Sequence, residues 1–203
     1  MSSFLDQPGV PIVHAEVRCD GSPRVLLRQE SAAAQGLWEA PVCVKGEGGS
    51  PQCVVMKERQ AEIRLEARCP SWVFANAGAA GYYRGELPPG QWAALIDHGF
   101  EHLSAAERVT AAADLAALVL SGRLPAGEAL ALLPKLAGDP EPRVVLAAVN
   151  LARTLAGIVP AELRAKYEEY LRGAFGGRAA GSREEIEALR RAQEKSVVEF
   201  LRR

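Results

Sequence analysis

Two histidines and a glutamate stand close together near the middle of the sequence. They occur as His98-Gly-Phe-Glu101-His102, an H-x-x-E-H pattern. On a helix, His98 and His102 lie one turn apart and could bind one zinc ion, with Glu101 as general base. Gly99 weakens a helix here, and Glu101 is adjacent to His102 instead of one turn away. Two interpretations stay open: a zinc site, or two partly exposed histidines at a helix C-terminus, where the helix dipole favours charged imidazole.

Other catalytic patterns are missing from the sequence. The third histidine, His14, lies on the polar face of an expected strand, and no G-x-S-x-G turn or phosphate-binding loop is present. The glycine-rich stretch 46–50 indicates a hairpin loop, because no helix follows it to present N–H groups to an anion. We therefore predict no catalytic residue and no bound cofactor in this chain.

The four cysteines do not form a C-x-x-C pair, which argues against a structural zinc site. They are Cys19, Cys43, Cys53 and Cys69. Cys43 and Cys53 lie on two expected strands joined by the loop 46–51, so a cross-strand disulfide is geometrically possible. The alternative is that the cysteines are small buried hydrophobic residues with free thiols.

Length and charge exclude several classes of protein. The chain has 203 residues and a formal net charge of −1, so it is long enough for two small domains and lacks the basic face of a nucleic-acid-binding protein. It also lacks a polybasic membrane patch, an apolar run of about 18 residues, and a visible signal peptide. We expect a soluble protein without nucleic-acid or membrane partners, in the cytoplasm or the periplasm.

The first part of the chain has the pattern of short strands. Apolar and polar residues alternate, and turn signals such as Asp20-Gly21 separate the runs. The expected strands are 10–19, 24–29, 41–45, 52–57, 62–67, 73–75 and 82–84. Seven short strands at this spacing predict an immunoglobulin-like β-sandwich domain over residues 1–87.

The period changes to that of helices after Pro88-Pro89-Gly90. Ser104 and Glu107 form a capping box, and Gly122 ends the following helix. The expected helices are 91–103, 104–121, 126–137, 141–156, 160–176 and 183–201. Short Gly/Pro breaks between them predict antiparallel pairs in an all-α, HEAT- or armadillo-like domain over residues 88–203.

The segment Trp72–Arg84, here called the junction segment, separates the two patterns. It reads W-x-x-x-N-x-x-x-x-G-Y-Y-R and resembles the junction in zinc aminopeptidases of the aminopeptidase N type, where a β-sandwich domain meets a C-terminal helical domain. Similarity extends over residues 4 to 122. It includes Gln7-Pro-Gly-Val-Pro11, Gln29, Trp38-Glu-Ala-Pro-Val42, Trp92-x-x-Leu95, Leu103-Ser104-x-x-Glu107-Arg108 and Asp114-x-x-Ala117-Leu118-x-x-x-Gly122.

The resemblance implies a non-catalytic C-terminal region of a protein that removes N-terminal residues from peptides. The family's H-E-x-x-H and G-x-M-E-N motifs are absent, so zinc would belong to a preceding catalytic domain. Tyr82 and Tyr83 match a junction motif and not the family's catalytic tyrosine. The expected partners are that catalytic domain of the same polypeptide and a peptide substrate. The alternatives are a stand-alone peptide- or protein-binding module, and a small metalloprotease that uses His98, Glu101 and His102.

Overall fold

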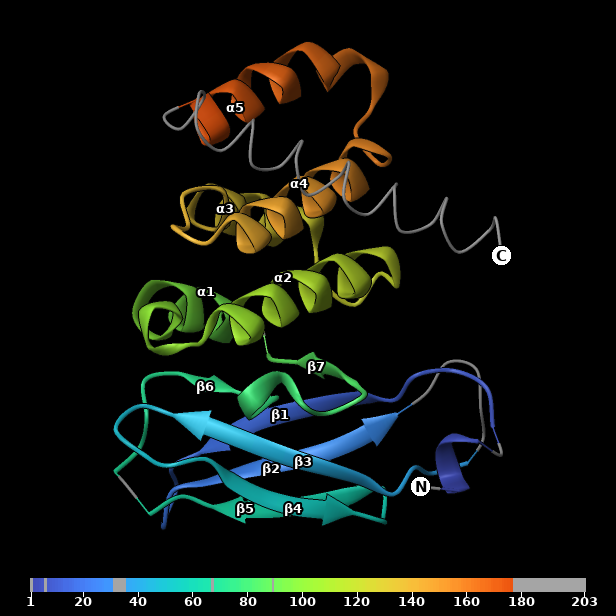
Figure 1. Ribbon diagram of the computed structural model, residues 1–203, viewed down its shortest axis with the longest axis vertical. Helices are drawn as coiled ribbons and strands as arrows, with labels where there is room; N and C mark the ends of the chain where they lie inside the picture. The colour runs from blue at the N-terminus through green and yellow to red at the C-terminus, as the bar shows by residue number, and fades with distance from the viewer. Residues whose placement is uncertain (1, 6, 31–35, 67, 89, 177–203) are drawn as a thin grey trace, which may run out of the picture. The chain divides into compact units, whose positions relative to one another are not determined.

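The computed structural model describes the chain except for residues 1, 6, 31–35, 67, 89 and 177–203. It divides into two compact units, Met1–Leu124 and Pro125–Arg203. Strands precede helices along the chain (Figure 1), which confirms the predicted order of β then α. The predicted last helix, 183–201, lies outside the described residues. No described helix has both the length and the apolar character to cross a membrane.

Four strands form one sheet in the order β5-β2-β1-β7 (Figure 1). Strands β1 and β2 and strands β2 and β5 pair in antiparallel fashion, whereas β1 and β7 are parallel. The strands are β1 (Ile12–Arg18), β2 (Arg24–Glu30), β5 (Gln60–Arg64) and β7 (Arg84–Glu86). The parallel pairing places the end of the junction segment beside the first strand, although they are far apart in sequence.

The other three strands form a second sheet in the order β4-β3-β6. They are β3 (Ala40–Gly46), β4 (Gln52–Met56) and β6 (Val73–Phe74). In both sheets alternate apolar side chains are buried, as expected for strands with one face against a core. The core residues of the strands are Val13, Ala15, Val25, Leu27, Ala40, Val42, Val44, Met56, Ile63, Val73 and Phe74.

Two helical segments complete the first unit. The first begins as α1 (Gln91–Ala94), widens to a π-helix at Leu95–Gly99, and ends in a 3-10 turn at Phe100–His102. The second is α2 (Ala105–Leu120). α2 contacts β7 and the junction segment. The strand-bearing unit therefore extends to Leu124, past the end of the last strand.

The predicted signals at the ends of α2 are confirmed. The Ser104 hydroxyl accepts a hydrogen bond from the backbone of Glu107, and the Glu107 carboxylate accepts one from the backbone of Ser104, which is the capping box. Gly122 follows the helix with a φ of +71°. Glycine suits this position because other residues seldom adopt positive φ.

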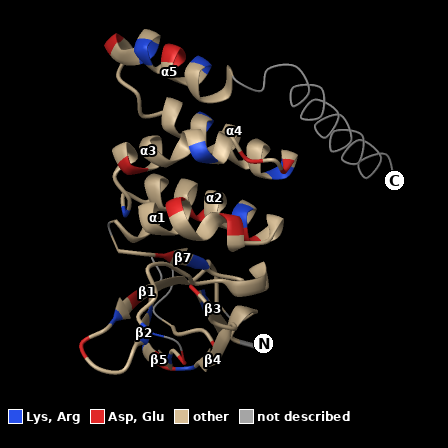
Figure 2. Ribbon diagram, turned by 90° about the vertical axis from the view of Figure 1, so that its left-hand side faces the viewer, with Lys and Arg blue, Asp and Glu red and all other residues tan. Residues whose placement is uncertain are grey.

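The second unit is described as three helices. They are α3 (Ala126–Ala137), α4 (Pro142–Ala156) and α5 (Arg164–Gly176), the last preceded by a 3-10 turn at Ala161–Leu163. α3 packs on α4, and α5 contacts both. The α3–α4 interface buries leucine, valine and alanine. α5 is charged along its length (Figure 2) and is attached through Tyr167 and Tyr170, whose hydroxyls donate to the carbonyls of Ala152 and Leu130.

Candidate functional site

A buried asparagine shapes the loop in the middle of the junction segment. Asn76 is 2% exposed. Its Nδ2 donates to the Gly81 carbonyl at 3.0 Å, and its Oδ1 accepts from the Gly81 amide at 2.9 Å. Within this loop Gly78 and Ala79 have positive φ values of 76° and 54°. Because both polar atoms of the Asn76 side chain form hydrogen bonds with the backbone of Gly81, Asn76 fixes the conformation of this loop.

Tyr83 joins the junction segment to strand β3. Its hydroxyl donates to the Ala75 carbonyl at 2.6 Å. Burial raises the pKa of Tyr83 above its usual range, and a hydrogen bond from the backbone amide of Cys43 partly opposes that rise. The same hydroxyl thus satisfies one backbone group on each of two segments, so Tyr83 is a structural residue, as its sequence position predicted.

Trp72 explains a glycine that the sequence alone made puzzling. Trp72 is 4% exposed, and its indole lies against Gly99, where an added Cβ would come within 2.4 Å of it. The His102 ring stacks on the indole with ring centroids 5.9 Å apart and planes 9° from parallel. Gly99 is therefore needed for close packing at the end of the π-helical segment.

Glu107 connects helix α2 to the junction segment and to β3. Besides its capping role, its Oε1 accepts from the Gly78 amide at 2.8 Å, and its Oε2 lies 3.6 Å from Nζ of Lys45. Burial raises the pKa of Glu107, but the hydrogen bonds from Gly78 and Ser104 and the charge of Lys45 leave it below the usual value. Lys45 also donates to the His102 carbonyl at 2.6 Å.

Asp114 is a buried carboxyl group between α2 and β7. It has no exposed surface, and its Oδ2 accepts from the Gly85 amide at 3.0 Å, while Arg84 Nη1 lies 3.4 Å from Oδ1. Burial raises the pKa of Asp114 to about 7 despite these two partners. A Cβ at residue 85 would lie 3.3 Å from Oδ2, so glycine permits this close approach.

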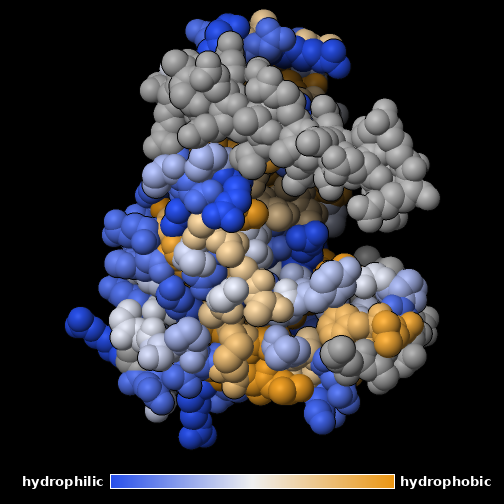
Figure 3. All heavy atoms as spheres, in the orientation of Figure 1, coloured by the Kyte–Doolittle hydropathy of each residue, from blue (hydrophilic) through white to orange (hydrophobic). Residues whose placement is uncertain are grey.

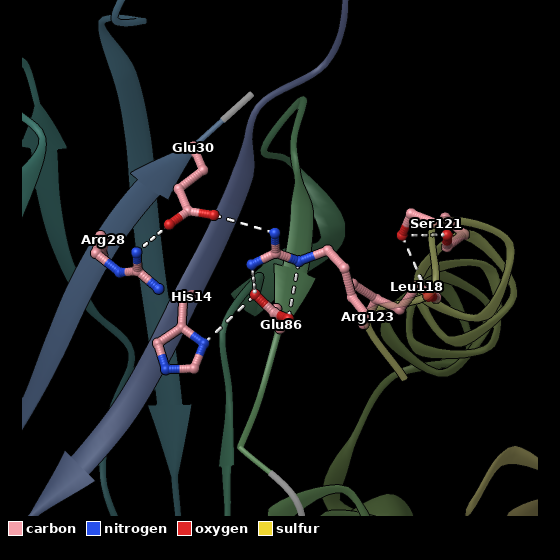
Figure 4. Close-up of polar contacts among 8 residues, drawn as sticks. His14, Arg28, Glu30, Glu86, Leu118, Ser121 and Arg123 are labelled. Carbon is pink, nitrogen blue, oxygen red and sulfur yellow. Dashed lines mark hydrogen bonds and ion pairs between the residues drawn. The ribbon is translucent and has the colours of Figure 1, made fainter. Parts of the chain in front are cut away.

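A charged network ties the end of α2 to the four-stranded sheet (Figure 4). Arg123 reaches Glu86 with Nε at 2.9 Å and Nη2 at 2.6 Å, and reaches Glu30 with Nη1 at 3.0 Å. His14 Nδ1 lies 3.4 Å from Glu86 on the other side, and Arg28 pairs with Glu30. Burial raises the pKa of Glu86, but His14 and Arg123 outweigh it and lower the pKa to about 2.

The structure does not gather the H-x-x-E-H residues into a metal site in the described part of the chain. His98, Glu101 and His102 are all exposed, and the helix that carries them changes from π to 3-10 winding between the histidines. His102 Nε2 lies 3.6 Å from Glu101 Oε1, while its ring is held by Trp72. In the described part of the chain, no three His, Cys, Asp or Glu residues are grouped so that they could hold a metal ion.

The cysteines are paired, so the interpretation as free buried thiols is wrong. Cys43 and Cys53 form the cross-strand disulfide that the sequence allowed, at directly opposite positions of β3 and β4. Cys19 and Cys69 form a second disulfide, which sequence reasoning missed. They are 50 residues apart, and only the folded sheets bring them together.

Sequence reasoning also missed the buried acid Asp114 and the second role of Glu107. A signal for Asp114 was present, because it is a charged residue on the apolar face that α2 presents through Leu115 and Leu118. Such a residue needs a buried partner. No signal identified Arg123, whose partners Glu30 and Glu86 lie on two strands that are far apart in sequence.

Comparison with known proteins agrees with this arrangement. Residues 72–199 match the ERAP1-like C-terminal domain family, so the match begins at the first residue of the junction segment. No curated protein matches the chain. The family match confirms the resemblance to the C-terminal part of aminopeptidase N-type enzymes. It covers more than half of the 203 residues, and the chain therefore belongs to the ERAP1-like C-terminal domain family.

Proposed function

We propose that this chain serves as the non-catalytic C-terminal region of a zinc-dependent aminopeptidase-like protein. The observation that carries the proposal is the family match over residues 72–199. In this proposal the parent protein removes N-terminal residues from peptides. The strand-bearing part spaces the catalytic domain from the helices, and the helices wall the peptide chamber.

The contacts of the junction segment support a spacing role. Asn76 closes its loop, Tyr83 joins it to β3, and Glu107 joins it to α2. The Arg123–Glu86 pair adds a further connection between α2 and β7. Because these contacts are buried or half-buried and well hydrogen-bonded, they resist bending between the strands and the first helices. A stiff connection is what a spacer requires.

The donor groups of this chain do not suit the parent protein's zinc. The described residues offer no group of three ligands, and the sequence has no H-E-x-x-H motif. We place zinc in a preceding catalytic domain of the same polypeptide, which would be the main partner. A peptide substrate would contact this chain only in the full-length protein.

Finer features of the fold belong to the same proposal. The buried alternate residues of both sheets favour an immunoglobulin-like β-sandwich, and the helices favour a HEAT-like domain. We keep the domain boundary between residues 87 and 88, where strands give way to helices. Two disulfides favour an oxidising compartment, such as the periplasm or the cell exterior, over the cytoplasm.

Hydrolysis of leucyl-anilide by the purified chain, with and without added zinc, tests the proposal. We expect no turnover above the uncatalysed rate. Turnover that chelators abolish and zinc restores would refute it, and loss of that turnover in His102→Ala would assign it to the H-x-x-E-H residues. The DNA upstream of Met1 provides an independent test: a reading frame with an H-E-x-x-H domain supports the proposal, and a stop codon with a separate ribosome site supports a stand-alone binding module.

A further inference from the structure

The disulfide between Cys43 and Cys53 lies on the surface of an edge strand. β4 pairs only with β3 among the described strands. Cys53 is exposed and Cys43 is half-buried. Val55, which follows on the same face of β4, is 56% exposed, and Figure 3 shows an apolar area over β3 and β4. A small thiol can therefore reach this disulfide without unfolding of the core. Cys19 and Cys69 are exposed as well, so the geometry of the bridge, and not its exposure, must distinguish the two disulfides.

The strand register holds this bridge in a tight geometry. Cys43 and Cys53 are directly opposite each other, and their Cα atoms are 4.0 Å apart. Disulfides usually join Cα atoms about 4.4 to 6.8 Å apart, and shorter separations make the bond easier to reduce. The Cα atoms of Cys19 and Cys69 are 5.8 Å apart, within the usual range. The two disulfides should therefore differ in their resistance to reduction.

Strand β3 contacts the junction segment through its pairing with β6 and through Tyr83, and it contacts the start of α2 through Lys45. The backbone amide of Cys43 donates a hydrogen bond to the Tyr83 hydroxyl, which itself donates to the Ala75 carbonyl. Two residues further along β3, Lys45 holds the His102 carbonyl and pairs with Glu107. A change in the β3–β4 hairpin therefore reaches the junction segment and the start of α2.

From these observations we propose that Cys43–Cys53 is a thiol-exchange site that controls how firmly β3 holds the junction segment. The co-reactant is a low-molecular-weight thiol, and Cys53 is the sulfur attacked because it is the more exposed one. This inference does not depend on the aminopeptidase assignment. It requires only the two disulfides and the contacts of β3.

The exchange proceeds in two steps. The thiolate of the small thiol attacks Sγ of Cys53, a mixed disulfide forms, the bond to Cys43 breaks, and Cys43 leaves as a thiolate that takes a proton from water. A second thiolate then attacks the sulfur of the bound small thiol. The oxidised thiol dimer is released, and Cys53 leaves as a thiolate that takes a proton from water. The cysteine pair gains two electrons from the two small thiols, together with two protons that these thiols had released to water.

Graded reduction of the folded chain with glutathione tests the proposal. After each step, free thiols are alkylated and mapped by mass spectrometry, and hydrogen exchange is measured in peptides that cover 72–84 and 100–107. We expect Cys43 and Cys53 to be reduced at a glutathione concentration about tenfold lower than Cys19 and Cys69. The mixed disulfide should form on Cys53, and exchange should rise in both peptides while the helices of the second unit stay protected.

Matched double variants separate the two disulfides. In the Cys43→Ser/Cys53→Ser chain, hydrogen exchange at 72–84 should already be fast without glutathione. In the Cys19→Ser/Cys69→Ser chain, glutathione should still raise hydrogen exchange at 72–84. The proposal is overturned if Cys19–Cys69 opens first, if both disulfides open only together with global unfolding, or if glutathione attaches to Cys43. Unchanged hydrogen exchange at 72–84 after selective reduction would overturn the control of the junction segment.

Discussion

Among the described residues of the unit Met1–Leu124, four polar side chains are buried, and each makes hydrogen bonds to backbone groups. Gln29, Glu107 and Asp114 bond to another segment, and Asn76 closes its own loop. In the described part of the second unit, the interface of α3 and α4 is built from leucine, valine and alanine, and Asp139 is the one buried polar residue. Both disulfides also lie in the first unit.

The difference follows from how far apart in sequence the packed segments are. The first unit joins strands such as β1 and β7, whose register no turn fixes, so buried polar groups and disulfides specify the pairing. α3 and α4 follow each other in sequence with a short connection, and apolar packing alone is enough to position them. Buried polar groups and disulfides are therefore found where the packed segments are far apart in sequence.

The largest expected effect concerns the disulfide that closes the longest loop. We expect Cys19→Ser/Cys69→Ser to lower the free energy of unfolding of the first unit by about 4 kcal/mol, because cross-linking residues 50 apart restricts the unfolded chain. Tryptophan fluorescence during denaturant unfolding measures this effect, since Trp38, Trp72 and Trp92 all lie in the first unit.

The shorter disulfide provides the matched control. Its cysteines are 10 residues apart, so Cys43→Ser/Cys53→Ser should cost about 3 kcal/mol at most. If the two double variants shift the tryptophan transition equally, loop closure is not what distinguishes the two disulfides.

A smaller effect is expected in the apolar second unit. Leu151 is fully buried, and we expect Leu151→Ala to cost about 3 kcal/mol through lost burial and a residual cavity. Hydrogen exchange in α3 and α4 measures the loss, and the tryptophan transition of the first unit should move less. Leu163 is 45% exposed, so Leu163→Ala is the control and should cost less than about 0.5 kcal/mol. An equal loss in both variants would contradict a unit held by core packing.

The third effect is a pH dependence confined to the first unit. Glu86 has its pKa lowered to about 2 in the folded chain, so its stabilisation is present above its ordinary value of 4.5 and is lost as the pH falls toward 2. Glu107, with its lowered pKa, acts in the same direction. Asp114 has its pKa raised from 3.8 to about 7, so its contribution is full below pH 4 and is lost as the pH rises to 7.

The first unit should therefore be most stable near pH 4 to 5, where neither the stabilisation from Glu86 nor that from Asp114 is completely lost. Thermal unfolding followed by tryptophan fluorescence between pH 2 and 8 measures this profile. Asp114→Asn should remove the decline above pH 4, and Glu86→Gln should reduce the decline below it. A profile that Asp114→Asn leaves unchanged would show that this buried carboxyl does not titrate as its surroundings indicate.

The sequence predicted the elements of the fold better than their connections. Alternation identified the strands, and the capping box of Ser104 and Glu107 placed the start of α2, because both signals are local. β7 begins at Arg84, two residues after its predicted start at Tyr82. The Cys19–Cys69 disulfide depends on the folded sheets, and no local pattern could reveal it.

For the candidate site, local reasoning gave the residue types and not their surroundings. The spacing of His98 and His102 suggested that both could bind one metal ion. Spacing does not reveal the π and 3-10 winding between them, or the Trp72 indole on which the His102 ring stacks. The junction motif was the stronger signal. Its residues Trp72, Asn76 and Tyr83 each have a packing or hydrogen-bonding role in the structure.

The zinc content of the purified chain after dialysis against a mild chelator tests most directly whether this region is non-catalytic. Our account predicts far less than one zinc per chain, and the same low value in His98→Ala and His102→Ala. Near-stoichiometric zinc in the unmodified chain that either substitution removes would contradict it, because the H-x-x-E-H residues would then form a metal site and the chain itself would be a candidate enzyme.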